Sequence, residues 1–117
     1  MASETKVRLQ SADGELFEVE RGVATISTMV SNLLEDTSAE DIIPLPNVEA
    51  GILAKVIEYC RYHHMLQANP QTEEEVEKWN KDFVRVDKPT LFQLILAANY
   101  MDIQSLLDLT CKTVADM

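Results

Sequence analysis

The chain has 117 residues, which suits a single compact domain. Hydrophobic residues make up 46% and charged residues 26%, with three Gly and four Pro, so low-complexity, collagen-like and disulfide-scaffold classes are excluded. Ten basic and twenty acidic residues give a net charge of −10, which would repel a phosphate backbone or an anionic membrane. We therefore expect neither nucleic acid nor a membrane as a partner.

The first predicted element is a β-hairpin. Val7 and Leu9 alternate with polar neighbours, and Asp13-Gly14 supplies a turn. Phe17 and Val19 then fall on one side of the returning strand. The pattern predicts two antiparallel strands with one apolar face.

From Ala24 the apolar spacing changes to that of a helix. Its predicted buried face consists of Ile26, Met29, Val30, Leu33 and Leu34. A polar loop is expected over residues 35–41. Ile42, Ile43 and Leu45, flanked by two prolines, then predict a short strand at a sheet edge.

Asn47 is the predicted cap of the next helix. The apolar stripe of this helix is Val48, Ile52, Leu53, Val56, Ile57 and Cys60. His63 and His64 are expected in its last turn, near the negative end of the helix dipole. A loop is predicted over residues 65–71.

Three further helices complete the pattern. Thr72 and Glu75 form a capping box that begins a short helix, which Trp79 and Phe83 are expected to anchor to the core. An aromatic ligand pocket is the alternative for this pair. Asp87 or Thr90 is predicted to begin the next helix, with inward-facing Leu91, Leu94, Ile95 and Ala98.

Asp102 with Ser105 is predicted to begin the last helix. Its apolar residues are Ile103, Leu106, Leu107, Thr110 and Val114. Because strands come first and helices follow, the predicted fold class is α+β, a small sheet with helices packed against it.

The residues that could carry chemistry are few. The three glycines cannot form a phosphate-binding loop or a dinucleotide motif. Cys60, His63 and His64 share one helix face and could bind zinc, but a structural site needs four ligands and Cys60 continues the apolar stripe. We therefore interpret them as a core cysteine and helix-end histidines, and we expect no metal, no cofactor and no catalytic residue.

Two other features have simple structural interpretations. The acidic residues Glu73, Glu74, Glu75 and Glu77 resemble a binding surface, yet such runs are usually solvated and complement the helix dipole. Cys111 is expected to be a small buried residue. Two cysteines cannot form a disulfide framework, which favours a cytoplasmic or nuclear location.

Four strings carry a resemblance to a known family: LPNV (45–48), VIEYC (56–60), TLFQLILAANYMDI (90–103) and LLDLTCKTVADM (106–117). Through them the chain resembles the S-phase-kinase-associated adaptor (Skp) family over residues 7–117. The resemblance implies a single BTB/POZ domain over residues 1–117. It also implies a non-catalytic function, the bridging of a cullin scaffold to F-box substrate receptors in SCF ubiquitin ligases.

The resemblance also assigns site residues. The cullin-facing positions correspond to Asn99 and Tyr100. The F-box-facing positions correspond to Phe92, Ile95, Leu107, Cys111 and Val114. By spacing alone, the F-box-facing residues and Tyr100 also fit an ordinary core, so the resemblance separates the two interpretations.

The chain departs from the family pattern in two places. Between Val19 and Thr25 it is a few residues shorter, and Gly22 is expected to make a compensating bend. It also stops at Met117, where the family continues into further F-box-binding helices. We therefore expect cullin binding to be kept, F-box binding to be weakened and some self-association. An elongin-C-like adaptor and a self-assembling BTB homodimer are the alternatives.

Overall fold

The computed structural model describes residues 6–36 and 42–116. In chain order its elements are β1 (Lys6–Gln10), β2 (Leu16–Glu20), α1 (Arg21–Ala24), α2 (Thr28–Asp36), β3 (Ile42–Pro44), α3 (Ala50–Ala68), α4 (Glu73–Phe83), α5 (Lys88–Met101) and α6 (Gln104–Ala115). The side chain of Leu34, and most of the loop predicted over residues 35–41, lie outside the described part.

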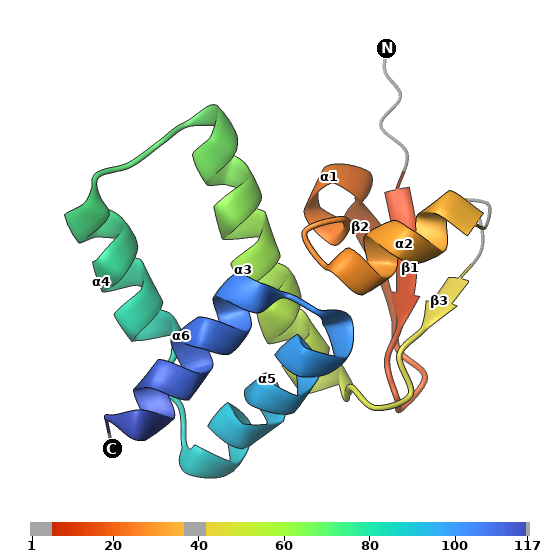
Figure 1. Cartoon of the computed structure of the whole chain (residues 1–117). Coiled ribbons are helices and arrows are strands. Elements are labelled where there is room, and N and C mark those ends of the chain that lie inside the picture. The colour runs from red at the N-terminus through yellow and green to blue at the C-terminus, as the bar shows by residue number, and fades with distance from the viewer. Residues whose placement is uncertain (1–5, 37–41, 117) are drawn as a thin grey trace.

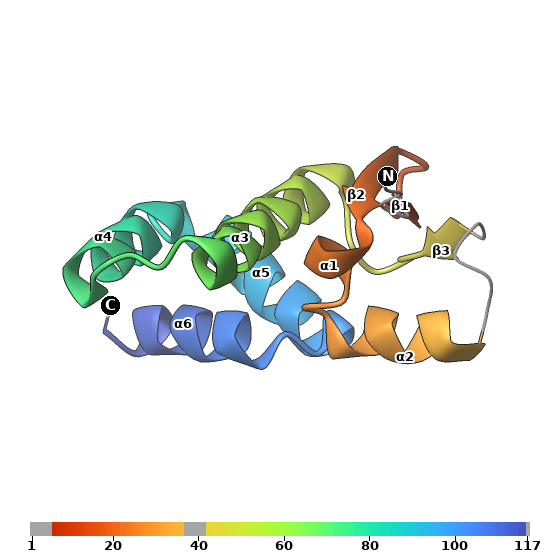
Figure 2. The same ribbon diagram turned by 90° about the horizontal axis from the view of Figure 1, so that it is seen from above.

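The elements form an elongated body of 41 × 32 × 20 Å. Figure 1 shows the sheet at one end beside α1 and α2, and α4 at the other end, with α3 between them. Figure 2 shows α5 between a layer that contains α3 and α4 and a layer that contains α6 and α2. No helix in the described ranges has the length and apolarity needed to cross a membrane.

The predicted hairpin and edge strand are confirmed. β1 and β2 pair antiparallel, with Val7 opposite Val19 and Leu9 opposite Phe17. β3 runs parallel to β1, and the order β2-β1-β3 places β3 at an edge. Val7, Leu9, Val19 and Ile43 are buried, so the sheet covers one side of the core.

The single helix predicted from Ala24 is wrong, because the chain forms two short helices, α1 and α2. The break has a polar cause. The hydroxyl of Ser27 accepts a hydrogen bond from the N–H of Val30 and donates one to the carbonyl of Met101. Ser27 thus caps α2 and ties its first turn to the end of α5.

Gly22 does not make the predicted bend, since it lies inside α1 and its φ is not positive. Its role is close packing. A Cβ atom at this position would lie 2.7 Å from Cε1 of His64, closer than real Cβ contacts come. The missing side chain therefore lets the His64 ring of α3 approach the α1 backbone.

Asn47 does not cap α3, which begins three residues later at Ala50. The N–H of Ala50 donates instead to the carboxylate of Asp13 in the hairpin turn, at 2.9 Å. The Ser11 hydroxyl also donates to Asp13, at 2.7 Å. These two hydrogen bonds lower the pKa of Asp13, and they join the hairpin turn to the start of α3.

The loop predicted over residues 65–71 begins too early, because α3 continues to Ala68. Asn69 leaves the helical conformation, with φ −142° and ψ 75°, and Pro70 follows it. The proline ring disfavours a helical conformation at the preceding residue, which explains why the helix ends here.

The later helix starts follow the prediction in part. Thr72 and Glu75 form the expected capping box of α4, and Asp87 occupies the cap position of α5. Asp102 does not begin α6. It ends α5 in the left-handed conformation, with φ 55°, and Ile103 precedes α6. A left-handed residue closes a helix, whereas a residue that begins one is extended.

The hairpin turn generates a stability prediction. Gly14 has φ 88°, which disfavours any side chain, whereas a Cβ at Gly51 in α3 meets no atom within 4 Å. We expect Gly14→Ala to lower the free energy of unfolding by about 1 kcal/mol and Gly51→Ala to raise it by about 0.5 kcal/mol. Urea denaturation of both variants measures this, and equal effects would contradict the turn geometry.

Candidate protein-interaction surface

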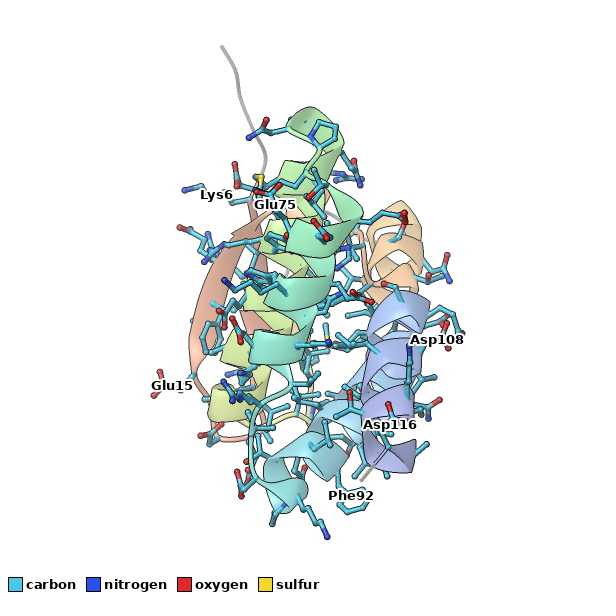
Figure 3. The ribbon with its side chains drawn as sticks, turned by 90° about the vertical axis from the view of Figure 1, so that its left-hand side faces the viewer. Lys6, Glu15, Glu75, Phe92, Asp108 and Asp116 are labelled. Carbon is cyan, nitrogen blue, oxygen red and sulfur yellow. The ribbon has the colours of Figure 1, made fainter. Side chains whose placement is uncertain are left out.

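The outer face of α5 carries two large apolar side chains that do not pack into the core. Leu91, Leu94 and Ala98 on the inner face are buried, whereas Phe92 is 52% and Leu96 is 59% exposed. Their spacing of four residues puts Phe92 and Leu96 on the same side of the helix. Figure 3 shows the ring of Phe92 pointing away from the ribbon at the bottom of the view.

Helix α6, which packs against α5, carries further apolar side chains that are not fully buried. Leu106 and Thr110 are buried, while Leu107 and Val114 are half-buried and Cys111 is exposed. The prediction of a buried Cys111 is therefore wrong, because this residue lies on the flank of α6 turned away from Leu106 and Thr110. Exposure likewise excludes an ordinary core position for Phe92 and Cys111.

We use the name α5–α6 stripe for this surface, which consists of Phe92, Ile95, Leu96, Leu107, Cys111 and Val114. Ile95 is half-buried and lies between the inner and outer faces of α5. Leu96 was not among the predicted site residues. Its position four residues after Phe92 in a helical pattern was the available signal, and only the observed exposure separates it from the core.

Asn99 and Tyr100 lie at the end of α5, where the chain turns into α6. Asn99 is exposed and Tyr100 is half-buried against the core. The turn is fixed by backbone bonds, since the N–H groups of Asp102 and Ile103 both donate to the carbonyl of Ala98. We call residues 99–102 the α5–α6 corner, and it presents an amide beside a phenol.

The aromatic residues of α3 and α4 form a structural cluster. Trp79 stacks on Tyr62, with ring centroids 3.9 Å apart, and on Phe83, at 5.1 Å. The amine of Lys55 lies over the Phe83 ring at 4.5 Å and donates to the Phe83 carbonyl at 3.2 Å. These contacts confirm that Trp79 and Phe83 anchor α4.

The three side chains considered for zinc have separate surroundings. Cys60 is 4% exposed, and burial raises the pKa of its thiol to about 12, which disfavours the thiolate that metals bind. The His63 ring packs against Tyr59 in a tilted arrangement, with ring centroids 4.1 Å apart, and His64 covers Gly22. In the described part of the chain, no three His, Cys, Asp or Glu side chains gather as metal ligands.

The acidic residues of α4 divide into two roles. Glu75 reaches back to Thr72 in the capping box, with 3.2 Å between the Glu75 carboxylate and the Thr72 N–H. Glu73, Glu74 and Glu77 are exposed and line an open hollow of about 550 Å³. The first-turn acids thus stabilise the helix start, as expected for a solvated face.

Burial lowers the pKa of His63 below its ordinary value of 6.5, and its Nε2 is buried without a hydrogen-bond partner. The folded state therefore binds a proton on this ring less readily than the unfolded chain does. We expect the free energy of unfolding to fall as the pH drops through about 6.5, and to fall less in His63→Leu. Urea titrations followed by Trp79 fluorescence measure this, and equal losses in both proteins would contradict it.

Comparison with known proteins identifies the family. Residues 5–65 match the model of the Skp1 family, tetramerisation domain, a POZ domain. This match agrees with the α+β arrangement of a small sheet and packed helices, so the predicted BTB/POZ fold class is confirmed.

The similar proteins extend the match across the chain. SKP1-like protein 11 of Arabidopsis thaliana is 52% identical over 115 residues, which cover 98% of this chain and 76% of that protein. The SCF ubiquitin ligase complex protein SKP1b of Dictyostelium discoideum is 48% identical over 120 residues, which cover 95% of this chain and 74% of that protein. The chain therefore belongs to the Skp1 family.

Proposed function

We propose that the protein is a non-catalytic adaptor of an SCF-type E3 ubiquitin ligase. It bridges a cullin scaffold, bound at Asn99 and Tyr100, to F-box substrate receptors, bound at the α5–α6 stripe. A cytoplasmic and nuclear location is part of this proposal. The names of the Dictyostelium relatives, which describe them as SCF ubiquitin ligase complex proteins, support the adaptor type.

The observation that carries the proposal is the exposed apolar surface on two otherwise well-packed helices. Phe92 and Leu96 are more than half exposed, although α5 has a continuous buried face of its own. Contiguous apolar side chains of this kind on a folded domain mark surfaces that bind other proteins. A large aromatic side chain such as Phe92 supplies the anchoring area that protein interfaces use.

Simultaneous binding of two partners is compatible with the geometry. Phe92 and Tyr100 are two helical turns apart, roughly 12 Å along α5. Asn99 and Tyr100 also differ in character from the stripe, because they combine an exposed amide with a half-buried phenol. One end of the helix thus suits a partner with polar groups, and the stripe suits an apolar helix face.

The cullin-facing role predicts the effect of a double substitution. Asn99→Lys with Tyr100→Lys removes the amide and phenol and adds two charges, so we expect at least about hundredfold weaker binding of a cullin N-terminal domain. Isothermal titration calorimetry measures the affinity. Circular dichroism checks that the variant is folded.

The matched control adds the same two charges elsewhere. Gln67 and Ala68 are neutral, exposed residues in the last turn of α3, so Gln67→Lys with Ala68→Lys should bind like the wild type. Equal loss in both double variants would show a general charge effect and contradict the assigned cullin face. A folded wild type that binds no cullin domain would overturn the proposed function.

The F-box-facing role predicts a separate loss. Phe92→Ala should weaken binding of an F-box domain by about 2 kcal/mol, or about thirtyfold, and leave cullin binding unchanged. Leu16→Ala is the control, because Leu16 is a comparably exposed apolar residue, at 53%, on β2. An unchanged F-box affinity in Phe92→Ala would contradict the assignment of the stripe.

Cys111 offers a second readout of the same interface. Its thiol is exposed, whereas the Cys60 thiol is buried, so alkylation of the native protein should occur first at Cys111. A bound F-box domain should slow that reaction, and a bound cullin domain should not. Light scattering before each titration shows whether the stripe also drives self-association, the second candidate for this apolar surface.

A further inference from the structure

The start of α2 is bonded to the backbone of the α5–α6 corner. The Ser27 hydroxyl donates to the carbonyl of Met101, and the N–H of Thr28 donates to the carbonyl of Asp102 at 3.2 Å. The same Ser27 oxygen accepts from the N–H of Val30 at 3.2 Å. Figure 2 shows α2 beginning beside the connection between α5 and α6.

These hydrogen bonds give partners to polar backbone groups at two helix ends, the start of α2 and the end of α5. The first N–H groups of a helix and its last carbonyls have no partner within the helix. Here the N–H groups come from Thr28 and Val30 of α2, and the carbonyls come from Met101 and Asp102, which directly follow Tyr100. The positive end of α2 also faces the negative end of α5, which favours the same arrangement.

Ser27 itself is 1% exposed, so its hydroxyl cannot contact a partner protein. Its position still affects Tyr100, because the carbonyl that it holds belongs to the next residue in the chain. Without that bond, the end of α5 would keep the internal bonds to Ala98 and Asn99 and the single bond from the Thr28 N–H to Asp102.

We propose that Ser27 is a positioning residue for the cullin-facing corner. Through Met101 it fixes the direction of Tyr100 and Asn99 before the partner binds, which reduces the ordering cost of binding. This inference rests on the proposed function, since it concerns the same cullin-facing residues. Preorganised interface residues lose less conformational freedom on binding than mobile ones.

Thr110 provides a control for the general cost of losing a buried hydroxyl. It is 0% exposed, and its hydroxyl donates to the carbonyl of Leu106 at 2.9 Å, within α6. Thr110→Ala therefore removes a comparable buried hydrogen bond without touching the corner. A purely structural role for Ser27 predicts that Ser27→Ala and Thr110→Ala affect cullin binding equally.

The test is calorimetric titration of the full chain with a cullin N-terminal domain. We expect Ser27→Ala to bind about tenfold more weakly than the wild type, and Thr110→Ala to stay within about twofold. Thr28→Pro is a second variant. It removes the N–H that bonds Asp102 at a helix position that accepts proline, and it should also weaken binding.

A double-mutant cycle shows whether Ser27 acts through Tyr100. Ser27→Ala should cause a smaller loss of affinity in Tyr100→Ala than in the wild type, because one of the two side chains that Ser27 positions is already absent. Additive losses would overturn the inference. The amide and ring NMR signals of Asn99 and Tyr100 in the unbound protein should also shift in Ser27→Ala and remain unchanged in Thr110→Ala.

The outcomes separate this inference from the proposed function. A wild type that binds no cullin domain overturns the proposed function and the role of Ser27 with it. A wild type that binds, together with Ser27→Ala and Thr28→Pro variants that bind equally well, overturns the positioning role alone. Loss of binding in both variants, with Thr110→Ala unaffected, supports it.

Discussion

The packing of α5 constrains the rest of the molecule, because helices from several parts of the chain contact it. α2, α3 and α6 all lie against α5, and its inner residues Leu91, Leu94 and Ala98 are fully buried. Burial of each leucine contributes roughly 2 kcal/mol, so the inner face dominates the stability of this region. A helix with such a face leaves its other side available, and Phe92 and Leu96 occupy that side. The same element thus carries the core and the proposed interaction surface.

The end of α5 depends on polar bonds and not on apolar packing alone. Asp102 adopts a left-handed conformation that is rare for a residue with a side chain, and hydrogen bonds on both sides of it hold the chain there. Ser27 and Thr28, which lie far away in the sequence, supply the bonds from outside α5. The direction of Asn99 and Tyr100 is therefore a property of the tertiary structure, although both residues belong to a regular helix.

The hairpin turn shows the same dependence between distant segments. Asp13 was predicted as part of a tight turn. Within that turn, its carboxylate accepts a hydrogen bond from the Ser11 hydroxyl. Its carboxylate also accepts from the N–H of Ala50, so the turn caps the helix that Asn47 was expected to cap. Local capping rules identify the right kind of residue. They cannot identify a residue that the fold brings from another part of the chain.

The sequence by itself determined the elements whose causes are local. Alternation predicted the hairpin, helical spacing predicted α3 to α6, and the Thr72 capping box was found because its two partners are three residues apart. The family resemblance supplied the candidate residues of the interaction surface. Local spacing could not distinguish a core helix face from a binding face, since both require apolar residues at the same intervals.

Only the tertiary structure decided which apolar residues remain exposed and where the helices break. Cys111 was expected to be buried and Leu96 was assigned neither to the core nor to the site, yet both side chains are exposed. The division between α1 and α2 arises from the bond between Ser27 and Met101, which are separated by most of the chain. Exposure and long-range hydrogen bonds depend on which segments meet in space, and for that reason the sequence pattern alone does not contain them.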